Sequence, residues 1–365
     1  MESKLREIIK SISAADAAAV KAAEERQAKL AKPPGSLGVL EDISVKLAGI
    51  TGQVKNKVDN TRILVFAADN GVVSEGVSCT PQSVTASQVM NMTRHKTGMS
   101  TLAKEFGCSI EIYDMGIATP YNGTGIINRS LGAGTANIAE GAAMTREACV
   151  TAIMTGIEAA DRAAADGIQA VGIGEMGIGN TTTSACVLAA LTGSDAQQVC
   201  GRGGGLTDTA FEHKKEVVAR ALEVNKPQRD DPIDVLAKVG GFDLAAMTGA
   251  FIGCAKNSAA AVVDGYISTV AALCAVRLCP AVRDYIFLSH ASFEVGCRIA
   301  QEALDLKPCL LLGMRLGEGS GCPIMFQVMR AACSIICDMA SFEEAAINDS
   351  YLEEIRRIDG FTVKK

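Results

Sequence analysis

A carboxylate flanked by glycines stands near the end of the chain, at Glu318 in the segment 315–319, Arg-Leu-Gly-Glu-Gly. Flanking glycines let such a side chain approach a ligand closely without committing its backbone to a helix or strand. A carboxylate presented in this way can act as a general base that removes a proton from a substrate nitrogen. It can equally mark a helix start, where the helix dipole favours negative charge. On these residues alone both interpretations stay open.

The strongest local pattern is a glycine-rich run at residues 172–183, Gly-Ile-Gly-Glu-Met-Gly-Ile-Gly-Asn-Thr-Thr-Thr. It follows a predicted strand and opens an apolar helix that runs to Leu191. Helix-start N–H groups beside amide and hydroxyl side chains suit a phosphate. The run also fits Gly-x-Gly-x-x-Gly, but the acidic residue that a dinucleotide site needs about 20 residues later is missing. The pattern therefore predicts a phosphate cradle, with a purely structural turn as the alternative.

A second glycine cluster, at residues 201–205, precedes a helix that carries Lys214 and Lys215. Successive backbone N–H groups can form an anion nest, and a lysine can add a point charge for a phosphate. The alternative is a flexible loop followed by a solvated basic helix face. For Lys215 we favour this alternative.

Six short apolar runs, each followed by a helical pattern, predict the elements that would position these groups. They are residues 63–67, 109–113, 168–173, 260–263, 285–288 and 309–312. Strands separated by helices indicate a parallel sheet with helices on both faces. We therefore expect an α/β fold with about six parallel strands in a three-layer core, and terminal helices that form a smaller unit.

Carboxylates follow several of the predicted strands, at the edge of the sheet where ligands bind. Besides Glu318 they include Asp69, Asp114, Glu175 and Asp264. Acidic residues also cap helices and begin turns, so any one of them can be structural.

Composition excludes several classes of protein. Hydrophobic residues make up 48% and charged residues 21% of the 365 residues, which is typical of a globular chain. Thirty-five basic against 41 acidic side chains give a net charge of −6, the wrong sign for a broad nucleic-acid footprint. The 13 cysteines are scattered without C-x-x-C, and the three histidines lack ligand spacing, so we expect free thiols and no metal site. A charged amino terminus and no long uncharged apolar run predict a cytoplasmic protein without a membrane span.

Eight segments in one order resemble the family of nicotinate-nucleotide:dimethylbenzimidazole phosphoribosyltransferases, which assemble the lower nucleotide loop of cobamides. They are residues 32–38, 81–85, 174–182, 201–208, 240–242, 289–292, 315–319 and 341–345. The resemblance implies transfer of the phosphoribosyl group of nicotinate mononucleotide to 5,6-dimethylbenzimidazole or a related base, giving α-ribazole 5′-phosphate and nicotinate. It also implies a Rossmann-like large domain at residues 61–321, a small helical domain from residues 1–60 and 322–365, a homodimer, and no cofactor.

Position by position, the resemblance makes Glu318 the general base and places Glu175 near the ribose and the reacting centre. It assigns to the phosphate and ribose Gly177, Gly179, Asn180, Thr181, Lys214 and Ser292. It assigns to the wall of the base pocket Pro81, Gln82, Gln88, Met176 and Leu316. The chain departs from the family at Asn70 and Cys297, where histidine is usual, so the accepted base or the pH profile is expected to differ.

Three questions stay open at this point. The apolar, Ala- and Gly-rich stretch from Leu244 to Leu278 predicts either a dimer interface or the core of the large domain, and the resemblance favours a dimer whose active site is complete only on assembly. An oxidoreductase that uses a nicotinamide dinucleotide is one rival function. A non-catalytic nucleotide-binding protein, which would not need Glu318, is the other. The sequence also leaves open whether the base is a benzimidazole, a purine or a phenol.

Overall fold

The computed structural model describes residues 1–352, which form two compact units. The larger unit comprises residues 1–13 and 60–325, and the smaller comprises residues 14–59 and the chain from 326 onward. Residues 1–13 were expected in the small domain, but helix α1 (Glu2–Ser11) packs against α6 (Arg146–Ala165) and α11 (Phe242–Lys256) of the larger unit.

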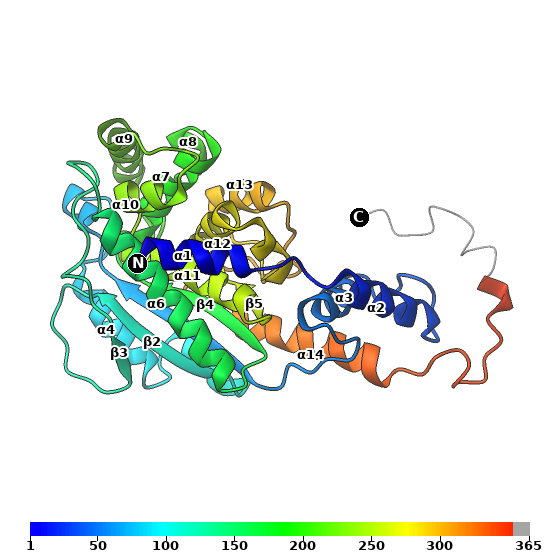
Figure 1. The fold of residues 1–365 in the computed structure, drawn as a ribbon. Coiled ribbons are helices and arrows are strands. Elements are labelled where there is room, and N and C mark those ends of the chain that lie inside the picture. Colours follow the sequence, from blue (N-terminus) through cyan, green and yellow to red (C-terminus); the bar gives the residue numbers. More distant parts are fainter. Residues whose placement is uncertain (353–365) are drawn as a thin grey trace. The chain divides into compact units, whose positions relative to one another are not determined.

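The elements of the larger unit alternate as the sequence predicts (Figure 1). After α1 they are β1 (Thr61–Ala68), η1 (Gly71–Glu75), α4 (Ser83–Met92), α5 (Gly98–Glu105), β2 (Ser109–Gly116), β3 (Ile126–Asn128), α6, β4 (Ala170–Met176), α7 (Asn180–Thr192), α8 (Ala196–Val199), α9 (Asp208–Asn225), α10 (Pro232–Val239), α11, β5 (Ala260–Val263), α12 (Tyr266–Leu278), η2 (Pro280–Tyr285), β6 (Ile286–Leu288) and α13 (Val295–Leu304). Helix α14 (Cys322–Asp338) begins in this unit and continues into the smaller one.

The sheet has six strands in the order β3-β2-β1-β4-β5-β6, and every pair is parallel. The predicted α/β fold with about six parallel strands is thereby confirmed. The order reverses direction between β1 and β4, and loops at the carboxyl ends diverge at such a point and leave room for a ligand.

Helices lie against both faces of the sheet. The chain moves one way along the sheet from β1 to β2 and the other way from β4 to β6, so right-handed crossovers put the connecting helices on opposite faces. Accordingly α4 and α5 contact β1, β2 and β4, whereas α11 contacts β1, β2, β4 and β5, and α12 contacts β4 and β5.

One predicted strand is wrong. Residues 309–312 do not form a strand: Leu310 makes a single bridge to His290, and Leu311 is 83% exposed. The sixth strand is instead β3, three residues that pair with β2 at the edge of the sheet. The apolar character of residues 309–312 suggested a buried strand, but this segment is largely at the surface.

The Ala- and Gly-rich stretch forms the core of the larger unit. Every residue of α11 from Phe242 to Ala255 is buried, and the helix packs closely on α6. A Cβ on Gly156 of α6 would lie 1.8 Å from the Ala246 carbonyl oxygen, so only glycine permits this approach. The small residues thus serve packing between helices of one chain, so of the two alternatives that the sequence left open, this stretch forms the core of the larger unit.

The smaller unit contains α2 (Ala17–Lys29), α3 (Val39–Thr51), most of α14 and η3 (Ser350–Leu352). Asp16 caps α2 by accepting hydrogen bonds from the Ala18 and Ala19 N–H groups. Ala23, Ala48 and Ile336 bring the three longer helices together in a small core. Among residues 1–352, no helix combines the length and apolar character that crossing a membrane requires.

Candidate active site

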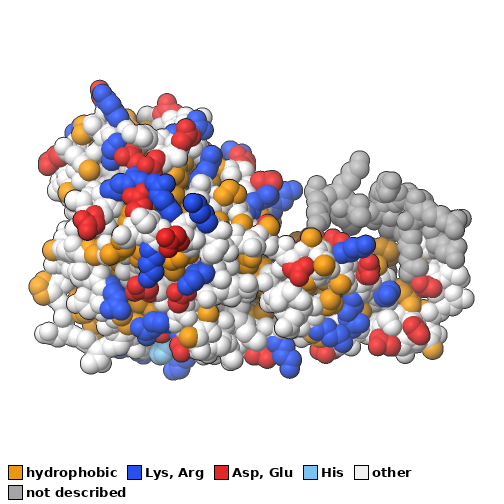
Figure 2. Space-filling model, in the orientation of Figure 1, with side chains coloured by type: hydrophobic (Ala, Val, Ile, Leu, Met, Phe, Trp, Pro, Cys, Tyr) orange, Lys and Arg blue, Asp and Glu red, His pale blue; other side chains and the backbone are white. Residues whose placement is uncertain are grey.

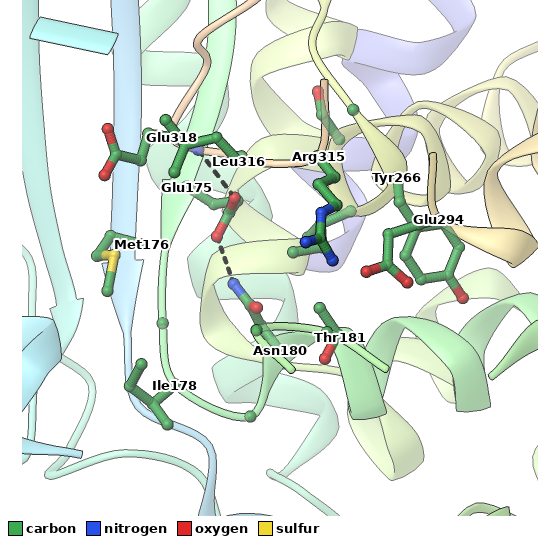
Figure 3. A pocket seen from close by; sticks show the side chains of 18 of the residues that line it. Glu175, Met176, Ile178, Asn180, Thr181, Tyr266, Glu294, Arg315, Leu316 and Glu318 are labelled. Carbon is green, nitrogen blue, oxygen red and sulfur yellow. Dashed lines mark hydrogen bonds between the residues drawn. The ribbon is translucent and has the colours of Figure 1, made fainter. Parts of the chain in front are cut away.

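A cavity of about 310 Å³ lies in the larger unit at the carboxyl ends of the sheet strands (Figure 3). Its wall comes from segments that follow four different strands and from the loop that carries Glu318. Residues 78–88 follow β1, residues 175–181 comprise the end of β4 and the loop after it, residues 264–268 follow β5, and residues 292–294 follow β6. The reversal of strand order therefore positions the site, as expected for an open α/β sheet.

The glycine-rich run after β4 forms one side of this cavity. A Cβ on Gly177 would lie 2.1 Å from the Ala68 carbonyl oxygen, and Gly179 has a φ of +94°. Both positions therefore require glycine, the first for close approach and the second for a left-handed backbone. Helix α7 begins at the next residue, so Asn180 and Thr181 line the cavity at a helix amino terminus, a favourable place for a phosphate.

The second glycine cluster meets the first at Thr181. Gly203 and Gly204 line the cavity, and a Cβ on Gly203 would lie 3.1 Å from Thr181 Oγ1. Lys214, on α9, is 1% exposed, and its Nζ donates a hydrogen bond of 2.9 Å to the same hydroxyl. Burial lowers the pKa of Lys214. The two glycine loops and helix α9 thus bring a buried amine and backbone N–H groups to one point.

Lys215, beside it in the sequence, points elsewhere. Its Nζ pairs with Glu212 at 2.8 Å and lies 4.2 Å from the centre of the Phe211 ring. Lys215 thus lies outside the cavity, as expected, but its side chain is only 12% exposed, so the expectation of a solvated helix face is wrong for this residue.

Glu318 occupies the opposite side of the cavity with a φ of +64°, unusual for a residue other than glycine. The side chain is 4% exposed, and its Oε2 accepts a hydrogen bond of 3.2 Å from the Met99 N–H at the start of α5. The Gln88 Nε2 donates to its Oε1 at 3.4 Å. Strained backbone held by surrounding contacts is typical of functional sites, and it fixes this carboxylate in the cavity.

Asp264 and Gly174 hold the loop that carries Glu318. The Asp264 carboxylate accepts hydrogen bonds from the Gly319 N–H at 3.0 Å and the Gly321 N–H at 2.7 Å. A Cβ on Gly174, within β4, would lie 2.4 Å from the Glu318 carbonyl oxygen, so glycine lets the loop lie on the strand. Gly174 therefore lies within β4, where it allows this close packing of the loop on the strand. Because the packing explains this glycine, the Gly-x-Gly-x-x-Gly pattern no longer favours a dinucleotide site.

Glu175 lies between the two sides of the cavity. Its carboxylate accepts hydrogen bonds from the Asn180 amide and, at 3.2 Å, from the Glu318 N–H (Figure 3). Burial, and next the charge of Asp243, raise the pKa of Glu175 to about 8. Burial also raises the pKa of Asp243 to about 6 and that of Asp264 to about 7. Glu175 is therefore largely protonated at neutral pH, before any positive charge develops beside it.

The raised pKa of Glu175 predicts a pH-dependent stability difference. Its unfolded value is near 4.5, so between about pH 4.5 and 8 the folded protein holds a proton that the unfolded chain has released, and stability falls as pH rises. Glu175→Gln has no carboxyl group to titrate, so its stability should not fall with rising pH for this reason. Urea unfolding should show the variant gaining at least about 1 kcal/mol relative to wild type between pH 5 and pH 8. Glu302→Gln, on the surface of α13, should show no such gain, and a pH-independent difference for Glu175→Gln would contradict the assignment.

The side of the cavity that the resemblance assigns to the substrate base is lined by apolar and amide side chains. Gln88, Met176 and Leu316 all line it, together with Val84. Pro81 and Gln82 do not reach it, and Gln82 instead donates a hydrogen bond of 3.2 Å to the Asn70 carbonyl oxygen. Of the residues assigned to the phosphate and ribose, those besides Lys214 line the cavity directly: Gly177, Gly179, Asn180, Thr181 and Ser292.

Two of the strand-end carboxylates are structural. Asp69 accepts hydrogen bonds from the Thr85 hydroxyl at 2.7 Å and the Ala118 N–H at 2.8 Å. Asp114 accepts from the N–H groups of Gly116 and Ile117, both at 2.9 Å. They hold loops at the sheet edge, and neither lines the cavity.

The two departures from the family pattern lie behind the wall. Asn70 is fully buried, and its amide contacts the Ile178 carbonyl and the Thr183 hydroxyl, both at 3.4 Å. It therefore supports the glycine-rich loop after β4 from behind. Cys297 is buried on α13 and contacts the Thr269 hydroxyl at 3.9 Å.

Several lining residues were missed in the sequence assignment. Tyr266 and Glu294 line the cavity beside the phosphate loops, and Arg315 points into it between Thr181 and Glu294 (Figure 3). Ser78 and Thr80 line it from the loop after β1. Arg315 lies within the segment 315–319 that the sequence analysis had already singled out, and Tyr266 lies two residues after Asp264, so both could have been found. Glu294 has no such signal.

Comparison with known proteins agrees with this geometry. A family model described as "Phosphoribosyltransferase" matches residues 12–347. A nicotinate-nucleotide–dimethylbenzimidazole phosphoribosyltransferase of Clostridium perfringens (strain ATCC 13124) is 46% identical over 352 residues, covering 96% of this chain and 98% of the relative. One of Clostridium tetani is 44% identical over 353 residues, with coverage of 96% and 98%.

A crystal structure of the enzyme of that name from Thermus thermophilus matches with a TM-score of 0.86 and 38% identity, covering 91% of this chain and 99% of that chain. The resemblance inferred from the eight sequence segments is thus confirmed over nearly the whole chain. The chain belongs to the phosphoribosyltransferase family that includes these nicotinate-nucleotide–dimethylbenzimidazole enzymes.

Proposed function

We propose that this protein transfers the phosphoribosyl group of nicotinate mononucleotide to 5,6-dimethylbenzimidazole or a related base. The observation that carries the proposal is the placement of Glu318 across one cavity from the phosphate cradle of Asn180, Thr181 and Lys214. The cradle would fix the 5′-phosphate, and the wall with Met176 and Leu316 would accept a flat base. The names of the relatives support the same substrates.

The reaction is a single displacement at C1′ of the ribose. The ring nitrogen of the base that carries no proton forms the new bond to C1′, and Glu318 takes the proton from the other ring nitrogen, so that the product base is neutral. The bond from C1′ to the pyridinium nitrogen breaks, its electron pair stays on that nitrogen, and neutral pyridine nitrogen leaves in nicotinate. Attack from the opposite face converts the β-nucleotide into α-ribazole 5′-phosphate. Holding both substrates in one cavity supplies most of the required orientation.

Glu175 supports the reacting centre as a hydrogen-bonding group at first and as a charge later. With a pKa of about 8 it is mostly neutral at pH 7. The positive pyridinium ring of the bound nucleotide favours its ionisation, with the proton released to solvent. The Asn180 amide and the Glu318 N–H already donate hydrogen bonds to the carboxylate oxygens, which then face the positive charge that develops on the ribose.

The rival functions have less support. The oxidoreductase rested on Gly-x-Gly-x-x-Gly, whose second glycine packs against the Glu318 loop inside β4. A nucleotide-binding protein without activity gives no reason for a buried carboxylate in a strained backbone. Purified protein incubated with nicotinate mononucleotide and a benzimidazole should release nicotinate, and a panel of benzimidazoles, purines and phenols would identify the preferred base.

We propose no cofactor and a cytoplasmic protein that binds neither membrane nor nucleic acid. Among residues 1–352, no three His, Cys, Asp or Glu side chains are grouped to hold a metal ion. Buried thiols such as Cys186 and Cys274 suit a reducing compartment. The face in Figure 2 mixes Lys and Arg with Asp and Glu and shows no broad basic area.

We also propose a homodimer whose active site is complete only on assembly. Its support is a group of apolar side chains that are more than half exposed: Phe293, Val295, Leu311, Leu312 and Leu316. Leu316 also lines the cavity, so a partner that covers this group would adjoin the site. Sedimentation should give about twice the 37.9 kDa chain mass, with activity lost on dilution. A fully active species of one chain at micromolar concentration would contradict the dimer.

A further inference from the structure

A carboxylate lies among the groups that would bind the phosphate. Glu294 precedes α13 and lines the cavity next to Arg315 and Tyr266 (Figure 3). The Gly203 N–H donates a hydrogen bond to its carboxylate. A Cβ on Gly201 would come within 1.8 Å of Glu294 Oε2, so the second glycine cluster closes tightly around this side chain.

Glu294 also faces both cations of the phosphate side. Burial raises the pKa of Glu294, and the charges of Lys214 and Arg315 act against that rise by attracting the carboxylate. Besides Glu294, the groups whose charge would affect the pKa of Lys214 are the thiols of Cys186 and Cys200. Burial raises the pKa of both thiols, so they are neutral at pH 7. Glu294 therefore supplies the negative charge that offsets the buried amine. Without an opposing charge, burying this amine would be costly.

We propose that Glu294 competes with the 5′-phosphate of the substrate for the Gly203 N–H, Lys214 and Arg315, and so limits the affinity for the nucleotide. The proposal rests on the proposed function, because it takes the two glycine clusters as the phosphate cradle. A phosphate dianion and a carboxylate that share the same partners repel each other. The phosphate can therefore bind the Gly203 N–H, Lys214 and Arg315 only when the Glu294 carboxylate moves away from them.

The competition should change binding rather than chemistry. Glu294 has no recorded contact with Glu318 or Glu175 among the described residues. An interaction that affects the bound substrate and the transition state equally changes KM and leaves kcat unaltered. Glu294 is thus a specificity-determining residue for anions that enter the cradle: a dianion with several oxygens displaces it, and a weaker anion does not.

Titration calorimetry with inorganic phosphate tests the competition without catalysis. Glu294→Gln keeps an oxygen for the Gly203 N–H and removes the charge, and it should bind phosphate about tenfold more tightly than wild type. Glu294→Asp keeps the charge and should show no tightening. Glu302→Gln, with the same charge change on the exposed side of α13, should bind as wild type does. In turnover, Glu294→Gln should lower KM for nicotinate mononucleotide with kcat unchanged.

Phosphate binding by Glu294→Gln that equals or falls below wild-type binding, in protein with an unaltered thermal midpoint, would overturn the competition. Equal tightening by Gln and Asp would overturn it too, because the charge would then not be the cause. Both results are compatible with nicotinate release by the wild type, so they leave the proposed function standing. Wild-type protein that binds phosphate and releases no nicotinate would instead overturn the proposed function, while the same titrations still decide the competition.

Discussion

Replacing Glu318 by Gln is expected to lower kcat about 100-fold or more, because a positioned general base contributes roughly 10²- to 10⁴-fold. Gln keeps an oxygen for the Met99 N–H and cannot take up the N–H proton that the base must lose as it reacts. Binding of nicotinate mononucleotide should stay nearly unchanged, since the phosphate partners lie across the cavity. Steady-state turnover with a benzimidazole and equilibrium binding of the nucleotide provide the two measurements.

A phenolic acceptor gives this experiment an internal comparison. A phenol hydroxyl loses its proton with a pKa near 10. Phosphoribosyl transfer to a phenol should therefore depend less on Glu318 than transfer to a benzimidazole. Equal losses for both acceptors would point to a structural role for Glu318. Near-normal turnover with the benzimidazole would remove Glu318 from the base role altogether.

Replacing Lys214 by Ala should raise KM for nicotinate mononucleotide much more than KM for the base. Loss of a charge-assisted contact costs about 1.5–3 kcal/mol, which corresponds to roughly 10- to 150-fold in affinity. Lys214→Met, which fills more of the buried space, separates loss of charge from loss of packing. Initial rates at varied concentrations of each substrate give the two KM values.

Lys215→Ala is the matched control for Lys214, because it removes the same charge from the adjacent residue of α9. Lys215 pairs with Glu212 and lies over Phe211, away from the cavity, so its removal should leave both KM values near wild type. Equal effects of Lys214→Ala on both substrates would show that Lys214 acts through folding and not through the phosphate.

The sheet was predictable where strands are buried and bounded by small or polar residues. Strands β1, β2, β4, β5 and β6 all lie at predicted runs. The edge strand β3 was missed, because three residues carry too little pattern and only one of its edges is paired. Residues 309–312 were mistaken for a strand because hydropathy alone does not tell a buried apolar run from an exposed one, and Leu311 is exposed.

Within the site, the residue types and their glycine neighbours pointed correctly to the loops that meet in the cavity. Glu175 and Asn180 follow from strand-end position and glycine spacing, whereas Glu318 follows from its flanking glycines alone, because the strand predicted before it does not exist. The opposed charges of Lys214 and Glu294 do not follow from sequence, because about 80 residues separate them and only the closing of the second glycine cluster brings them together. The role of the stretch after Leu244 likewise depends on which helix packs against it.

The most direct test of the proposed function is to identify the product formed from nicotinate mononucleotide and 5,6-dimethylbenzimidazole. Single displacement with Glu318 as base predicts one nicotinate released for each α-ribazole 5′-phosphate formed, with the α configuration at C1′ established by nuclear magnetic resonance. A β-configured product would contradict the single displacement. Nicotinate release that needs no base and yields ribose 5-phosphate would contradict transfer itself.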